Sequence, residues 1–337
     1  MPTTHAVRDD RADPRAAAPA VLVSSVVRAT DQGESHGGVY LVDLNAGTSR
    51  QVIDWNAAGI SWEGRGADRG LRGIAFRGDR VYLAASDEIF VYDPEFRQIE
   101  SFRNPYLKHA HEICIAGGSL FVTSTGFDSV LELDLDSATW VRGWCLRRGV
   151  PQRIARRLGR HLSPSFRAFD PNAADGPVAA DTSHLNMVAS RDGVLYVSGT
   201  KTDRIYTIAD DRRGIHSRIP LGCHNAQPIG DDVIVNHTRS DRICLLDRDG
   251  RPVRGYALPS YDEAALVHGG MSRDLARPGF GRGLAVLPDG RILGGCSPAT
   301  VSLYDADDEH PVASVNLSMD VRNAIHGLAV WPFAIPS

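Results

Sequence analysis

Four histidines and two arginines occupy the same place in a pattern that this 337-residue chain repeats. In each copy the residue stands where a short apolar run begins, and a Gly/Asp turn and further alternating runs follow. Neutral imidazole is a common ligand of Zn²⁺, Fe²⁺ and Cu²⁺, and guanidinium pairs with carboxylate or phosphate. If the six side chains converge, they predict a metal centre beside an anion-binding group. They are Arg72, His111, His184, His224, Arg282 and His326.

The spacing of the copies predicts the elements that position these residues. Arg72 and His111 are 39 residues apart, and His184 and His224 are 40 apart. Each copy contains several short β-rich runs separated by Gly and Asp turn residues. Four short strands in a repeat of about 40 residues are typical of a β-propeller blade. We therefore expect an all-β fold, a six-bladed β-propeller.

One blade is split between the two ends of the sequence. The segment 326–332 reads as an innermost strand, and its partners are predicted at 21–27, 39–44 and 49–55. A C-terminal strand that joins N-terminal strands closes the ring and removes exposed sheet edges. We expect residues 1–18 to be a disordered tail and residues 19–337 to be a single propeller domain.

Two insertions interrupt the predicted blades, at about 145–181 and 260–279. The first is rich in arginine around a short predicted helix. It is either a solvated cap or a lid or docking surface over the mouth of the propeller. Long loops in compact domains are often functional, so both insertions are lid candidates.

Innermost strands line the central channel of a propeller, so the six equivalent positions should converge on its axis. His111, His184, His224 and His326 are then candidate metal ligands, with Zn or Fe expected first and Cu also suitable. A metal-free anion site and purely structural histidines are the alternatives. Strand alternation places Asn186 on the channel side and turns Glu112 and Cys223 away from it, although Glu112 could still support the neighbouring ligand His111 from behind.

Composition excludes several classes of function. Lys+Arg is 37 against Asp+Glu 41, a net charge of −4, which argues against a nucleic-acid binder. No apolar run is long enough for a membrane span. The five scattered cysteines form no CxxC motif, and the N-terminus does not resemble a secretory signal, so we expect a cytoplasmic protein. With only two lysines, a P-loop or Schiff-base mechanism has little basis. Abundant arginine and alanine indicate a high-GC, bacterial source.

The repeat phrase Gly-Leu-Ala-Val-Leu-Pro-Asp-Gly at 283–290 is generic to propellers. From about residue 20 onward the chain resembles the six-bladed group of gluconolactonases, strictosidine-synthase-like proteins and peptidyl-hydroxyglycine lyase. The gluconolactonase type uses carboxylate and Asn metal ligands, which the His/Arg position lacks. The lyase type combines channel histidines on zinc with essential arginines.

By this resemblance the four histidines would be the metal ligands, and Arg72 and Arg282 would be the catalytic arginines that hold an anionic substrate. The fourth histidine departs from the three-histidine pattern of the lyase. A four-histidine metal resembles instead the iron site of carotenoid-cleaving oxygenases, although those have seven blades.

These observations predict a metalloenzyme, a lyase or hydrolase acting on a small anionic metabolite or modified peptide. A non-heme iron or copper oxygenase using the same histidines is one alternative. A non-catalytic propeller that docks protein partners is another. The sequence leaves the oligomeric state open.

Overall fold

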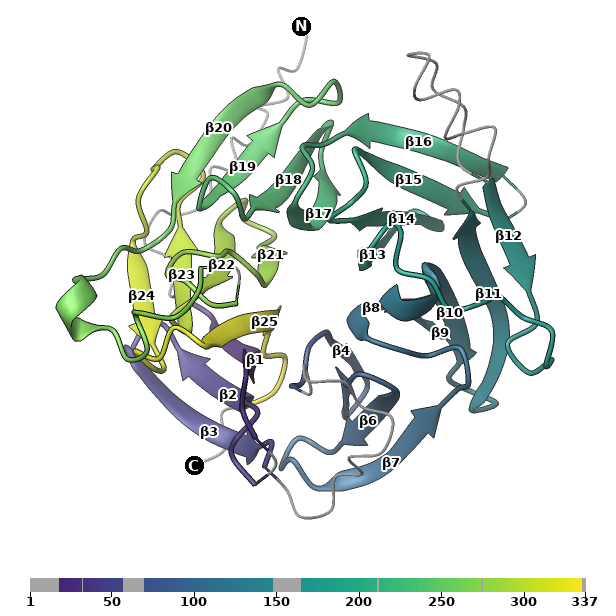
Figure 1. Ribbon diagram of the computed structural model, residues 1–337, viewed down its shortest axis with the longest axis horizontal. Coiled ribbons are helices and arrows are strands. Elements are labelled where there is room, and N and C mark those ends of the chain that lie inside the picture. Colours follow the sequence, from purple (N-terminus) through teal and green to yellow (C-terminus); the bar gives the residue numbers. More distant parts are fainter. Residues whose placement is uncertain are drawn as a thin grey trace, which may run out of the picture.

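The computed structural model describes residues 18–31, 33–56, 70–147, 165–210, 212–273 and 275–334. Within these residues, six antiparallel sheets stand around a central channel (Figure 1). The predicted all-β, six-bladed β-propeller is confirmed. The tail predicted at 1–18 lies outside the described residues except for its final residue.

The blades follow one another along the chain, each with its innermost strand first. Blade 2 contains β4 (Ile74–Arg77), β5 (Arg80–Ala84), β6 (Glu88–Tyr92) and β7 (Gln98–Arg103). Blade 3 contains β8 (Ala110–Ala116), β9 (Ser119–Ser124), β10 (Ser129–Asp134), β11 (Thr139–Arg147) and β12 (Ser165–Phe169), with the short helix η1 (Thr125–Phe127) after β9. Blade 4 contains β13 (Leu185–Arg191), β14 (Val194–Gly199), β15 (Arg204–Ala209) and β16 (Arg212–Arg218). Blade 5 contains β17 (Cys223–Ile229), β18 (Asp232–His237), β19 (Arg242–Leu246) and β20 (Pro252–Ala257). Blade 6 contains β21 (Leu284–Val286), β22 (Ile292–Cys296), β23 (Thr300–Tyr304) and β24 (Ala313–Asn316).

Blade 1 is the split blade, as the sequence predicts. It contains β1 (Ala20–Val27), β2 (Gly38–Asp43), β3 (Thr48–Asp54) and β25 (Asn323–Val330). β25 is innermost and pairs antiparallel with β1, with Val21 opposite Val330 and Val27 opposite Asn323. The ring is therefore closed by backbone hydrogen bonds between segments about 300 residues apart in sequence.

The hydrophobic core lies between neighbouring blades. One cluster joins Val39 and Leu41 of blade 1 to Val81, Leu83 and Phe90 of blade 2, all buried. The alternation of apolar and polar residues in each strand supplies these faces. Burial of each such side chain contributes about 1.5–3 kcal/mol before the entropy cost of ordering it.

Glycines allow the innermost strands of adjacent blades to approach closely. A Cβ added at Gly73 would lie 2.6 Å from the carbonyl oxygen of His111, to which the Gly73 N–H donates at 2.9 Å. A Cβ at Gly327 would lie 2.1 Å from the carbonyl oxygen of Arg72. The residues that follow Arg72 and His326 are glycines because a side chain there would clash with the backbone of the next innermost strand.

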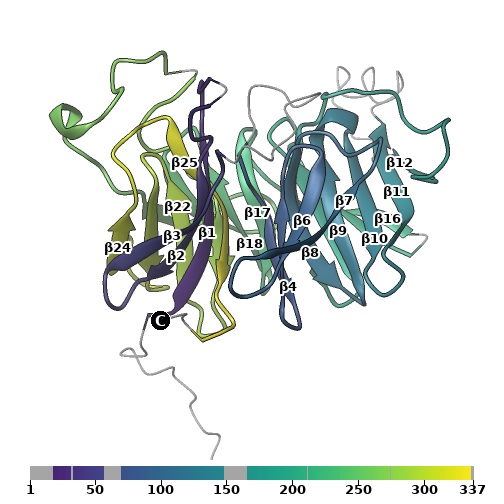
Figure 2. The same ribbon diagram turned by 90° about the horizontal axis from the view of Figure 1, so that it is seen from below.

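The two insertions emerge from the same face of the propeller (Figure 2). The first adds β12 as a fifth strand of blade 3. Residues 148–164, which hold most of the arginines around the helix predicted in this insertion, lie outside the described residues. The second lies between β20 and β21 and contains the short helix η2 (Glu263–Ala265). In the part of the chain that the structure describes, no helix is long and apolar enough to cross a membrane.

Candidate functional site

A cavity of about 430 Å³ opens at the mouth of the channel, where residues of both insertions, Asp181 and Leu275, contribute to its lining. It is lined mainly by basic and imidazole side chains, with one carboxylate and a short apolar wall. The lining residues are Arg28, Arg72, His109, His111, Thr125, Asp181, His184, Leu275, Phe280 and Arg282.

Four of the six residues singled out by the repeat line this cavity, namely Arg72, His111, His184 and Arg282. The other two, His224 and His326, are buried beside it without lining it. The rings of His111 and His184 are 5.5 Å apart between centroids, and those of His111 and His326 are 6.2 Å apart. The repeat therefore places the six side chains around one axis, but at different depths.

Hydrogen bonds to an aspartate hold the turn that presents His184. The Asp128 carboxylate accepts from the backbone N–H groups of Thr182 at 2.7 Å, Ser183 at 2.9 Å and His184 at 3.1 Å. His184 itself has a left-handed backbone, with φ of 50°. A non-glycine residue in that region is uncommon and is maintained by its surroundings, often at functional sites. Asp128, which precedes β10 of blade 3, thus holds the segment that leads into blade 4.

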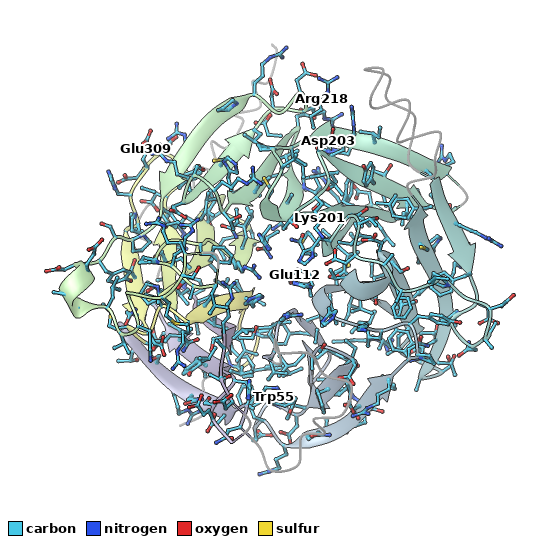
Figure 3. All side chains as sticks on the ribbon, viewed as in Figure 1. Trp55, Glu112, Lys201, Asp203, Arg218 and Glu309 are labelled. Atoms are coloured by element: carbon cyan, nitrogen blue, oxygen red, sulfur yellow. The ribbon has the colours of Figure 1, made fainter. Side chains whose placement is uncertain are left out.

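Register shifts in the innermost strands change which side chains face the channel. In β8 the shift falls between Ala110 and Ile113, so His111 and Glu112 escape strict alternation. Glu112 was expected to point away from the channel, and this prediction is wrong. Its Oε1 accepts from Nδ2 of Asn225 in blade 5, at 2.8 Å, and Figure 3 shows Glu112 near the centre of the ring. A β-bulge re-aims a side chain in this way.

Below the histidines, Glu112 belongs to a network that crosses the channel. Asn225 Oδ1 accepts from Asn236 Nδ2 at 3.1 Å and from the Gly283 N–H at 3.0 Å. The network therefore links blades 3, 5 and 6. Burial raises the pKa of Glu112 to about 8, and the hydrogen bond from Asn225 and the charge of Arg72 oppose that rise only in part. Glu112 is therefore mostly protonated at neutral pH.

Neighbouring groups fix the tautomers of His111 and His184, two of the histidines that line the cavity. His184 Nδ1 lies 2.9 Å from Oδ2 of Asp181, an acceptor, so Nδ1 carries the proton. His111 Nδ1 lies 2.9 Å from the carbonyl oxygen of His109, which again only accepts. The Thr125 hydroxyl, 2.8 Å from His111 Nδ1, donates its own proton to the Leu185 carbonyl. Both histidines consequently carry their lone pair on Nε2.

The two deeper histidines differ from this pair. His326 Nε2 accepts from Nη1 of Arg282 at 3.1 Å, so its lone pair is already used. Both ring nitrogens of His224 are buried and have no hydrogen-bond partner among the described residues. Burial without a partner costs a polar group about 1–3 kcal/mol.

All four histidines are neutral at physiological pH. Burial lowers the pKa of His111, His224 and His326 well below 6.5, and the nearby arginines lower it further. Burial also lowers the pKa of His184, while its hydrogen bond to Asp181 opposes the shift. Partial burial raises the pKa of the Asp181 carboxyl, but His184 and Lys201 outweigh that effect and leave it below its usual value. The cavity therefore contains neutral imidazoles in a positive potential.

The arrangement does not fit a four-histidine metal centre. No group of three or more His, Cys, Asp or Glu side chains is placed to hold a metal ion in the described part of the chain. The guanidinium of Arg282 donates to the nitrogen that His326 would need for coordination. Arginines beside the rings also repel a cation and attract an anion. The metal site predicted from the repeat remains a prediction that these contacts do not support.

Six lining residues lie outside the six repeat positions, among them Arg28, Asp181 and Phe280, which were missed in the sequence. Arg28 follows β1, Asp181 lies at the end of the first insertion, and Phe280 lies just after the second. The guanidiniums of Arg28 and Arg282 lie 4.3 Å and 4.6 Å from the centroid of the Phe280 ring. Cation–π contacts of this kind hold both charges at the cavity wall. The position of Asp181, three residues before His184, was the one signal that could have found it.

Comparisons with known proteins show the fold. No family model matches the chain, and no curated protein matches its sequence. A protein of unknown function from Bacteroides caccae is 12% identical, with a TM-score of 0.53 over 92% of this chain and 98% of its own. The WD40 β-propeller domain of Doa1 is 10% identical, with a TM-score of 0.50 over 90% of this chain and 84% of its own. Virginiamycin B lyase from Staphylococcus aureus is 10% identical, with a TM-score of 0.39 over 70% of each chain. At these identities the chain is similar to β-propellers in architecture alone.

Proposed function

We propose that the protein is a metal-free lyase that binds a small carboxylate at the channel mouth and removes a proton from it with His184. One observation carries the proposal: three arginines and a neutral histidine, whose Nδ1 is paired with Asp181 and whose lone pair is on Nε2, line the same cavity. Arginine recognises carboxylates through paired N–H donors. A histidine that is neutral at pH 7 is competent as a general base.

The residues divide the work of an elimination. Arg28, Arg72 and Arg282 hold the substrate carboxylate and stabilise the negative charge that develops next to it. His184 Nε2 takes the proton from the adjacent carbon, the C–H electron pair forms the new double bond, and the leaving group departs with its own electron pair. Asp181 keeps the proton on Nδ1 and stabilises the imidazolium that forms. His111 Nε2, which also carries a lone pair, accepts the proton and passes it to the leaving group or to solvent.

Anion binding is the first test. Isothermal titration calorimetry with succinate, inorganic phosphate and uncharged succinamide should show binding of the anions but not of the amide. Arg282→Gln should weaken succinate binding at least tenfold, because one charge-assisted contact is worth about 1.5–3 kcal/mol. Arg251→Gln, on the exposed loop after β19, is the matched control and should bind like the wild type. Equal binding by both variants would contradict the proposal.

A metalloenzyme is the second candidate, and the unpartnered nitrogens of His224 favour it. Elemental analysis of protein purified without chelator, after reconstitution with Fe²⁺, Zn²⁺ or Cu²⁺, separates the two candidates. Metal-free protein that still binds succinate supports the proposal. One equivalent of metal in the wild type and none in His111→Ala would replace it with a metal-dependent lyase, hydrolase or oxygenase.

A further inference from the structure

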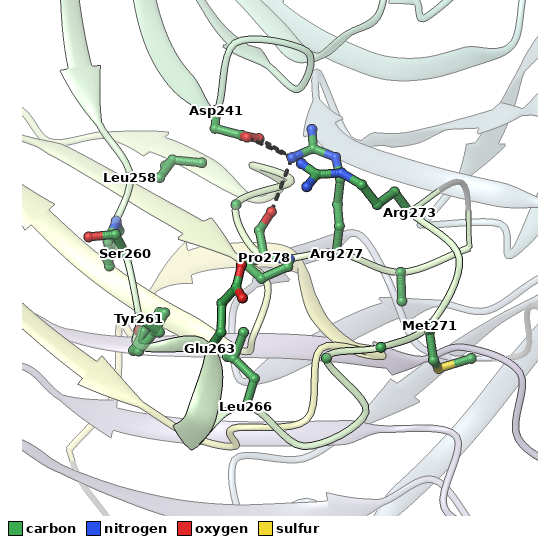
Figure 4. Close-up of a pocket in the computed structure, with 15 residues that line it drawn as sticks. Asp241, Leu258, Ser260, Tyr261, Glu263, Leu266, Met271, Arg273, Arg277 and Pro278 are labelled. Carbon is green, nitrogen blue, oxygen red and sulfur yellow. Dashed lines mark hydrogen bonds and ion pairs between the residues drawn. The ribbon is translucent and has the colours of Figure 1, made fainter.

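A second cavity, of about 610 Å³, lies under the insertion between β20 and β21 (Figure 4). Its lining includes the apolar side chains of Leu258, Leu266, Met271 and Pro278. The volume is within the ~300–1,000 Å³ that is usual for small-molecule sites. Neither the repeat nor the proposed reaction uses this cavity.

One short segment separates the two cavities. Leu275 and Phe280 line the channel cavity, whereas the residues between them, 276–279, line the second one. The cavities therefore lie on two sides of a wall only a few residues long. A molecule that reaches over this wall could occupy both.

Contacts on both sides fix the wall in place. Arg277 Nη1 donates to the two carboxylate oxygens of Asp241 at 2.7 Å and 2.6 Å, an interaction drawn in Figure 4. The Phe280 N–H donates to the same carboxylate at 3.0 Å. From the channel side, Arg28 Nη1 donates to the Leu275 carbonyl at 3.0 Å. Because the wall is anchored before any ligand arrives, little ordering entropy is lost on binding.

The two cavities differ in charge. Three arginines and one carboxylate line the channel cavity. In the second cavity Arg273 and Arg277 are matched by Asp241 and Glu263, and the remaining lining is largely apolar. The first therefore selects an acidic group and the second an uncharged, apolar one.

We propose that the ligand is bipartite: its carboxylate head lies in the channel cavity, and an apolar chain or ring attached to it crosses the wall into the second cavity. This inference rests on the proposed function, because the head is the group on which His184 would act. The substrate class is thus an amphipathic carboxylate rather than a short, fully polar acid.

Calorimetry with succinate, 2-butylsuccinate and 2-octylsuccinate tests the proposal. Affinity should rise with chain length, by up to about fourfold for each methylene that is buried. Gly270→Trp should remove this gain and leave succinate binding unchanged. Gly270 lines the second cavity, and a Cβ built on it meets no atom within 4 Å, so the indole fills space without displacing the backbone. Val253→Trp, at a half-exposed position on β20, is the control and should keep the gain.

The outcomes separate the two proposals. If succinate binds but the alkyl chain adds no affinity, or if Gly270→Trp binds 2-octylsuccinate like the wild type, the bipartite ligand is wrong and the proposed function stands. If none of the three acids binds, the proposed function is wrong, and the bipartite ligand that rests on it is wrong as well. If only the octyl compound binds, and Arg282→Gln binds it equally well, the second cavity is an independent apolar site and both proposals fail.

Discussion

His184 and His224 occupy the same place in neighbouring blades, yet their surroundings differ in every respect that matters for chemistry. The side chain of His184 is 28% exposed, lines the cavity and has Asp181 on Nδ1. His224 is 6% exposed, does not line the cavity, and has no partner on either nitrogen among the described residues. The repeat supplies an imidazole in both blades, but only one of them is equipped as a base.

The difference comes from the insertion that precedes blade 4. That segment ends with Asp181, whose carboxylate lies beside His184 and the ammonium of Lys201. Blade 5 follows blade 4 through a short connection that brings no carboxylate to His224. The blades therefore provide equivalent positions, and irregular segments between them decide which position becomes reactive.

The largest expected effect distinguishes the two histidines directly. His184→Gln should reduce turnover of the carboxylate substrate by about 10²–10⁴-fold, the usual contribution of general-base catalysis. Its melting temperature should change little, because the side chain is partly exposed. Steady-state kinetics on a carboxylate identified by the binding screen, together with thermal denaturation, measures both. A His224→Gln variant that lost as much turnover would show that both histidines take part in the reaction.

The next effect concerns the buried side of the channel. Glu112→Gln retains an acceptor for Asn225 and removes the free-energy cost of keeping a carboxyl group protonated. Glu112 has a pKa of about 8 in the folded state, so between about pH 4.3 and 8 it ionises in the unfolded chain but stays protonated in the folded protein. The free energy of unfolding is therefore highest below about pH 4.3 and falls as the pH rises to 8. The variant should therefore unfold with a free energy up to about 3 kcal/mol higher at pH 7 and be nearly unchanged at pH 4.5. Urea denaturation at both pH values tests this; equal shifts would show that Glu112 ionises normally.

A smaller effect follows from replacing the unpartnered imidazole. The pKa of His224 is lowered in the folded state, so below about pH 6.5 the unfolded chain takes up a proton that the folded protein does not. Stability is thus complete above that pH and falls as pH decreases. His224→Leu should reduce this slope by about 1.4 kcal/mol per pH unit and leave the protein at least as stable at pH 7. Destabilisation at pH 7 would indicate that a ligand occupies the histidine nitrogens.

The smallest effect refines the role of Asp181. Turnover should fall at acidic pH as His184 becomes protonated, with an apparent pKa below 6.5. Asp181→Asn removes the hydrogen bond and the negative charge that favour the protonated form, so the acidic limb should move to still lower pH, along with a lower maximum rate. Lys201→Gln is the control for the neighbouring charge and should move the limb in the opposite direction. A limb that stays in place in Asp181→Asn would remove Asp181 from the mechanism.

Much of the architecture could be predicted from the sequence because it is repeated. Alternating strands, Gly/Asp turns and a spacing of about 40 residues define the blades, and the split blade follows from unpaired runs at the two ends. The same regularity located Arg72, His111, His184 and Arg282 on the cavity wall. A repeated pattern predicts only the features that the blades have in common, and the strands, the turns and these channel positions are such features.

What the blades do not share escaped prediction. Glu112 is a separate case: it reaches the channel through a register shift in β8, which β13 and β17 also contain but which leaves no sequence signal as distinct as a turn. Arg28, Asp181 and Phe280 lie in connecting segments, outside the repeated strands. The depth difference between His184 and His224 depends on those segments as well, so the equivalence of the four histidines was overestimated.

The pairing of β25 with β1 has a consequence for biosynthesis. His326 lies on β25, and the neighbouring Gly327 packs against the carbonyl of Arg72 in blade 2. His326 and Arg72 therefore reach their places beside the channel only after β25 has paired with β1. During translation β1 leaves the ribosome about 300 residues earlier and must wait with an unpaired edge. A nascent chain that stops before β25 therefore leaves the inner edge of blade 1 unpaired and the ring around the channel open.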